Sequence, residues 1–215
     1  MFLHGQTEAD FRDAVRHLTR TDERLAGALD RFGQPDFWHR QPGFATLVLF
    51  ILEQQVSLAS GAAAFNRIRA RIGEVTPEAV LLPSDADLRE DGFSRQKARY
   101  VRELARAVLD GRIDLASLGS LSDDDVRRQL LGLIGIGPWT SDVYLLSCLR
   151  RPDIWPVLDR GLQVATGEVL GLEVVPDPVM LLELCERWRP HRSAAARIMW
   201  HSYLAKRGRK EIALY

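Results

Sequence analysis

The residues best suited to chemistry surround two glycines in the segment L-L-G-L-I-G-I-G-P-W-T, residues 130–140. Gly135 and Gly137 permit positive φ angles and a close approach of the backbone, and Ile136 between them can turn into a core. Exposed amides at the start of the following helix, together with Thr140, form a site suited to a DNA phosphate. The segment is typical of a helix-hairpin-helix motif, although a G-x-G turn can also be a simple connector between helices.

A candidate carboxylate, Asp159, stands twenty residues after Trp139 in the segment R-P-D-I-W-P-V-L-D-R-G-L. Taken alone, an aspartate in L-D-R-G-L is most simply a helix N-cap. Capping and chemistry are compatible roles for one carboxylate. The five tryptophans are each expected in the core unless a further pattern singles them out.

Helices must position these residues, because apolar residues recur three and four apart and no alternating pattern persists. We therefore predict an all-α fold. Ser94 predicts the start of a helix that ends before Gly111, and Ser122 with an acid three residues later predicts another. Pro138 opens a third helix, so the motif spans about residues 122–149. Further helices are expected near residues 7–30, 44–71, 159–170, 178–188 and 192–206.

The composition narrows the class of protein. A chain of 215 residues, 46% hydrophobic, can bury a sizeable core without disulfides or metal. Two cysteines, Cys148 and Cys185, are too few for a disulfide framework, a thiolate zinc site or a four-cysteine iron-sulfur cluster. The histidines show no ligand spacing. We therefore expect no cofactor and no metal, with a monovalent cation at the hairpin carbonyls as the one site left open.

Charge and hydropathy bear on nucleic-acid binding and on whether the chain enters a membrane. Lys+Arg and Asp+Glu both number 29, which argues against a protein that coats nucleic acid by bulk charge. A basic run follows Glu186 and includes Lys210; it fits either a solvated helix face or a binding patch. Residues 44–52 form the longest nearly apolar stretch, far short of a membrane span. We expect a soluble, cytoplasmic protein, associated with the nucleoid if bacterial.

Four segments together resemble the helix-hairpin-helix DNA glycosylase superfamily, and within it the 3-methyladenine DNA glycosylase II family. The resemblance runs from about Phe44 to Trp200, without the extra N-terminal β-rich domain of larger members. The segments are I-L-E-Q-Q-V-S at 51–57, G-F-S-R-Q-K-A-R-Y at 92–100, G-I-G-P-W-T-S-D at 135–142 and W-R-P-H-R-S-A-A-A-R-I-M-W at 188–200.

The resemblance implies roles for individual residues. Asp159 would be the catalytic carboxylate, and Trp139 and Trp200 would line the base pocket. Gln55 would be the wedge that enters the gap left by a flipped nucleotide. Bifunctional relatives carry a lysine at the position of Trp139, and an indole cannot form their Schiff base.

The sequence departs from the family at two positions near these residues. Val143 stands where some relatives have an aromatic residue. Leu158 replaces the polar residue often found before the aspartate. Both departures are compatible with a more open pocket and an altered substrate preference.

The resemblance also implies an architecture of two helical domains with the active site in the cleft between them. Residues 44–155 would form the middle domain, which carries the hairpin, and residues 1–43 with 156–215 would form the other.

The implied activity is that of a monofunctional DNA glycosylase of base excision repair. It would act as a monomer on double-stranded DNA, flip out an alkylated base such as 3-methyladenine and hydrolyse its N-glycosidic bond. Two alternatives stay open: a non-catalytic DNA-binding or damage-sensing protein, and a glycosylase for deaminated or oxidised bases.

Overall fold

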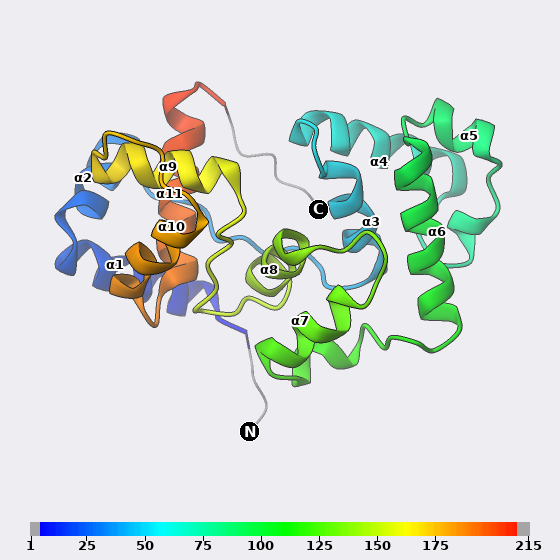
Figure 1. Ribbon diagram of the computed structural model, residues 1–215, viewed down its shortest axis with the longest axis horizontal. Coiled ribbons are helices and arrows are strands. Elements are labelled where there is room, and N and C mark those ends of the chain that lie inside the picture. Colours follow the sequence, from blue (N-terminus) through cyan, green and yellow to red (C-terminus); the bar gives the residue numbers. More distant parts are fainter. Residues whose placement is uncertain (1–4, 210–215) are drawn as a thin grey trace. The chain divides into compact units, whose positions relative to one another are not determined.

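The computed structural model describes residues 5–209, and within them it contains helices and turns but no strand (Figure 1). The predicted all-α fold is confirmed. None of the helices in this range is long and apolar enough to cross a membrane. Residues 1–4 and 210–215, which the sequence assigned to the ends of one domain, lie outside the described residues. Lys210 of the basic run is among them.

The described chain divides into two compact units. One, here called the hairpin unit, comprises residues 40–144, and the other, the carboxylate unit, comprises residues 5–39 and 145–209. The sequence placed the divisions at residues 43/44 and 155/156, whereas the contacts divide the chain at 39/40 and 144/145.

The hairpin unit is built around α3, whose residues from Leu47 to Glu53 are all buried. Helices α4 and α6 pack against α3. The helices of this unit are α3 (Phe44–Glu53), α4 (Leu58–Ile72), α5 (Asp85–Glu90), α6 (Arg95–Leu109), α7 (Asp123–Leu131) and α8 (Pro138–Ser147, which continues past the division), with 3-10 turns at Ala79–Leu81 and Ser117–Ser120.

The carboxylate unit is organised around α11, which packs against α1, α2 and α9. Small residues from Ser193 to Ala196 are buried in its first turns and allow close approach of neighbouring helices. The helices are α1 (Glu8–Thr21), α2 (Glu23–Phe32), α9 (Arg160–Leu170), α10 (Pro178–Cys185) and α11 (Arg192–Lys206), with a 3-10 turn at Glu186–Trp188.

Two of the predicted helices are each divided into two. The helix expected over 7–30 breaks at Asp22, whose carboxylate accepts hydrogen bonds from two backbone N–H groups and caps α2. The helix expected over 44–71 breaks after α3, where Gln55 has a φ of 57° and Ser57 then caps α4. Apolar periodicity continues through both breaks, so only the capping residues mark them.

The predicted helix starts around the hairpin are confirmed. Ser94 accepts a hydrogen bond from the Lys97 backbone N–H, and Ser122 accepts one from the Asp125 N–H. The Ser122 hydroxyl also donates to the Asp125 carboxylate at 2.6 Å, as the acid three residues after the cap predicts.

Candidate active site

Asp159 is the N-cap residue of α9. Its backbone is extended, with φ −76° and ψ 112°, and its Oδ1 accepts a hydrogen bond from the Leu162 N–H at 2.7 Å. The simplest interpretation of L-D-R-G-L, an N-cap, is therefore correct. The partial positive charge at a helix N-terminus also interacts favourably with a carboxylate, so the cap serves both shape and charge.

Trp200, on α11, reaches the same carboxylate. Its indole Nε1 donates to Asp159 Oδ1 at 3.0 Å. Only 7% of Trp200 is exposed. Two donors from different helices therefore converge on one oxygen, and they fix the orientation of the carboxyl group.

Trp38, which the sequence assigned to the core, stacks on Trp200. Their ring centroids are 5.0 Å apart and the rings are inclined by 22°. Arg197 also contacts Trp38, and its guanidinium carbon lies 3.7 Å from the centroid of the Trp38 ring. Trp38 is thus part of the support of Asp159.

Arg197 is almost completely buried, with 1% of its surface exposed. Its Nη2 donates to the Asp36 carbonyl at 2.8 Å and its Nε donates to the same oxygen at 3.3 Å. Arg197 precedes Trp200 by three residues, so both side chains lie on one face of α11. That spacing is the sequence signal from which Arg197 could have been assigned to the site.

Gly161 leaves room beside the carboxylate. A Cβ at this position would lie 3.1 Å from Asp159 Oδ1 and within 4 Å of Tyr203 and Trp200. A larger side chain would therefore press on the carboxyl group. The glycine in D-R-G-L has a local role that sequence analysis did not assign.

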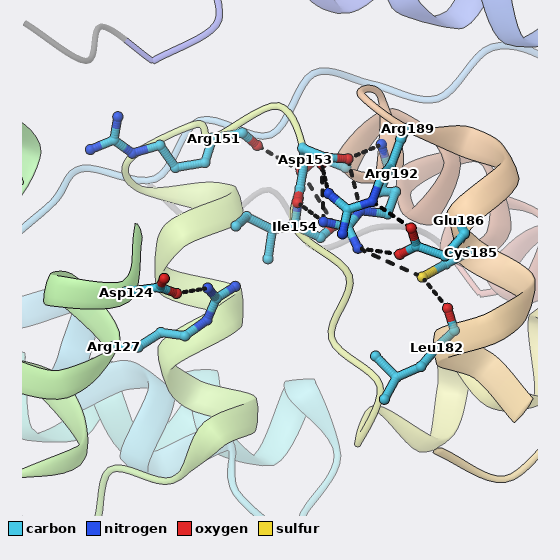
Figure 2. A network of polar contacts seen from close by, with 11 residues as sticks. Asp124, Arg127, Arg151, Asp153, Ile154, Leu182, Cys185, Glu186, Arg189 and Arg192 are labelled. Carbon is cyan, nitrogen blue, oxygen red and sulfur yellow. Dashed lines mark hydrogen bonds and ion pairs between the residues drawn. The ribbon is translucent and has the colours of Figure 1, made fainter. Parts of the chain in front are cut away.

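The chain before Asp159 is anchored by a group of ion pairs around Asp153 (Figure 2). Arg192, at the start of α11, donates from Nε to Asp153 Oδ1 at 2.7 Å, and Arg189 donates to Oδ2 at 2.9 Å. Glu186 accepts from both arginines. The network fixes the start of the connection to Asp159, and it explains part of the basic run as structural.

The hairpin has the predicted turn at Gly135, which has a φ of 90°. A Cβ there would collide with the ring of Tyr100 on α6, so both the backbone angle and the packing require glycine. Ile136 is 5% exposed and enters the core as expected. Gly137 is different, since its φ is not positive and a Cβ on it would meet no atom within 4 Å.

Thr140 is buried, and its hydroxyl accepts a hydrogen bond from Gln54 at 3.1 Å. The Thr140 hydroxyl is therefore engaged within the hairpin unit. Gln54 also donates to the Gly135 carbonyl at 2.8 Å. Gln54 belongs to the same Q-Q-V-S segment as Gln55, the predicted wedge, but its residue type and position alone indicated no role.

Gln55 is exposed and adopts the left-handed conformation. Trp139 is half-buried in the first turn of α8 and belongs to the hairpin unit, whereas Asp159 and Trp200 belong to the carboxylate unit. Of the two departures from the family, Val143 is buried and Leu158 is 49% exposed. Among residues 5–209 no group of His, Cys, Asp and Glu side chains could hold a metal ion.

Residues 48–190 match the family described as HhH-GPD superfamily base excision DNA repair protein. The chain belongs to the HhH-GPD superfamily. The expected relationship to helix-hairpin-helix glycosylases is thereby confirmed.

Individual proteins resemble the chain over most of its length. It is 31% identical to the YfjP protein of Bacillus subtilis over 93% of this chain and 77% of that protein. The structure is similar to a DNA-3-methyladenine glycosidase from Bacillus halodurans, with a TM-score of 0.75, 28% identity and 88% coverage of both chains. It also resembles the Schizosaccharomyces pombe 3-methyladenine DNA glycosylase Mag1 in complex with abasic DNA, with a TM-score of 0.78, 26% identity, and coverage of 87% of this chain and 95% of that one.

Proposed function

We propose that the protein is a monofunctional DNA glycosylase of base excision repair, with Asp159 as its catalytic carboxylate. The observation that carries this proposal is the convergence of the Leu162 N–H and the Trp200 Nε1 on Asp159 Oδ1. A carboxylate held in one orientation can stabilise an oxocarbenium-like sugar and direct the attacking water. The proposed location of the protein is the cytoplasm, in association with the nucleoid if the protein is bacterial.

The substrate we propose is a base alkylated at a ring nitrogen, such as 3-methyladenine. Such a base carries positive charge and is already a good leaving group, so the enzyme needs an anion more than a general acid. The names of the Bacillus halodurans and Schizosaccharomyces pombe relatives support this substrate class. Aromatic faces attract a cationic base by about 2 kcal/mol when desolvated, and Trp139 and Trp200 are the residues proposed to supply them.

The identity of residue 139, a tryptophan, supports hydrolytic release of the base without cleavage of the DNA strand. Its indole has no amine that could attack the sugar carbon, so water is left as the nucleophile. A lyase would need a lysine in that role. The protein would release the free base and leave an abasic site.

Contact with double-stranded DNA is proposed for the hairpin and for Gln55. The space beside Gly137 and the amides at the start of α8 would admit a phosphate oxygen. Flipping the damaged nucleotide out of the duplex costs roughly a few kcal/mol. Gln55, which is exposed and has a left-handed backbone, would then fill the gap left in the duplex.

The test is incubation of the purified protein with methylated duplex DNA, followed by chromatographic identification of every free base. The proposal expects methylated purines to be released from the treated DNA and not from untreated DNA. Tight binding without release would favour the damage-sensing alternative. Release only from deaminated or oxidised DNA would retain the glycosylase and overturn its substrate class.

A further inference from the structure

Gln54 connects two segments of the hairpin unit that are far apart in sequence. Its side-chain Nε2 donates to the Gly135 carbonyl at 2.8 Å and to Thr140 Oγ1 at 3.1 Å. These two acceptors flank the turn that begins α8. An amide nitrogen has two hydrogens, and each has an acceptor here.

The bend after Gln54 is held at both of its ends. Gln54 is the C-cap residue of α3, and Gln55 follows it with a φ of 57°, a conformation that costs a non-glycine residue about 1 kcal/mol or more. Ser57 then caps α4 by accepting a hydrogen bond from the Ser60 N–H. The exposed residues Gln55 and Val56 therefore form a short tip between two fixed points.

The end of α3 is itself anchored. Lys97 on α6 donates from Nζ to the Leu52 carbonyl at 2.7 Å, and Arg40 pairs with Glu53 at 3.1 Å. Burial lowers the pKa of Lys97, but the ammonium has an acceptor at the end of the helix, where cations are favoured. Gln54 thus extends a rigid helix end onto the hairpin.

We infer that Gln54 is a positioning residue, which fixes the Gln55 tip at a set distance from the hairpin amides. This inference rests on the proposed function, because it assigns the tip to the duplex gap and the amides to a phosphate. On that proposal, the tip and the hairpin amides contact the same DNA duplex. A tip already locked to the hairpin would enter the gap without first being ordered.

The inference predicts that Gln54 acts through Gln55, and a double-mutant cycle measures this. Flipping is followed by the fluorescence of 2-aminopurine placed in a duplex at the target position, so no catalysis is required. We expect Gln54→Met, which keeps the length of the side chain but has no donor, to lower the flipping equilibrium about tenfold. In a Gln55→Ala background, the same change should lower it less than about twofold.

Two further variants control for folding. Gln34→Met changes an exposed glutamine outside the hairpin unit and should leave flipping unchanged. Thr140→Val removes one of the two acceptors while preserving the shape of the side chain. Thr140→Val should also lower the flipping equilibrium, and it tests the inference independently if Gln54→Met folds poorly.

Equal losses from Gln54→Met in the presence and absence of the Gln55 side chain would overturn the inference, and so would an undiminished flipping signal in a folded Gln54→Met protein. Base release is measured separately on the wild type. Its absence would count against the glycosylase proposal, whereas the flipping cycle reports on Gln54 alone.

Discussion

Trp200 donates its indole hydrogen to Asp159 Oδ1, the oxygen that also caps α9. The tryptophan is itself held by Trp38, and Trp38 by the buried guanidinium of Arg197. Three side chains in successive contact, those of Trp200, Trp38 and Arg197, thus support the candidate carboxylate. With 7% of its surface exposed, Trp200 can act on Asp159 whether or not it also touches a base.

The Trp200 hydrogen bond can be removed while the stacked ring is retained. Trp200→Phe keeps an aromatic ring against Trp38 but has no donor for Asp159. Hydrogen bonds to charged groups contribute about 1.5–3 kcal/mol, so we expect the single-turnover rate of base release to fall at least tenfold. The rate of base release by Trp200→Ala should be lower still, and this variant should also be less stable than the wild type. A Trp200→Phe rate within twofold of the wild type would show that the bond does not orient the carboxylate.

At Gly161 we expect stability and activity to change in opposite directions. Gly161→Ala adds a methyl group that would lie 3.1 Å from Asp159 Oδ1. Alanine favours a helix over glycine by up to about 1 kcal/mol, so the melting temperature should stay the same or rise. Displacement of the carboxylate should lower the rate of base release about tenfold. Unchanged activity in this variant would mean that the carboxyl group tolerates the added methyl.

The resemblance to one family assigned Asp159 and Trp200 to a single site, as carboxylate and base-pocket residue, and the structure joins the two by a hydrogen bond. The sequence did not indicate Trp38, Arg197 or Gln54. An arginine and a glutamine are ordinarily solvated, and it is tertiary packing that buries Arg197 and half-buries Gln54; Arg197 comes to lie against Trp38 from a distant part of the chain. Sequence periodicity reports which residues are buried, but not which buried polar groups meet.

Trapping with borohydride tests the absence of lyase chemistry. The wild-type protein should form no covalent adduct with DNA during turnover, because Trp139 has no amine for a Schiff base. A bifunctional helix-hairpin-helix glycosylase serves as the positive control. Efficient and specific trapping would assign the protein to the bifunctional branch.

Glu53, at the end of α3, predicts a pH dependence of stability. Burial raises the pKa of the Glu53 carboxyl, and the neighbouring Arg40 opposes that rise. An acid whose folded pKa lies above its unfolded value binds more protons in the folded state, so its contribution to stability falls as pH increases from about 4.5 through the folded pKa. The free energy of unfolding of the wild type, minus that of Glu53→Gln, should therefore decrease with pH in denaturant titrations. An increase with pH would show that Arg40 outweighs burial.

The helix starts were predictable because capping residues carry local signals. Ser94 and Ser122 both cap as their sequence contexts indicate. The breaks at Asp22 and Gln55 were not predicted, since the apolar pattern continues across them. The short helix α5 was also missed, although Ser84 and Asp87 form a capping box at its start, because six residues are too few to show a period.

Asp159→Asn provides the most direct test of the central claim. Asparagine still caps a helix and its amide oxygen can still accept from Trp200, but it carries no negative charge. The single-turnover release of 3-methyladenine from methylated duplex DNA should fall by at least about 10²-fold, while the dissociation constant for that DNA stays within about tenfold. Base release at near the wild-type rate by a folded Asp159→Asn protein would contradict the assignment of Asp159 as the catalytic carboxylate.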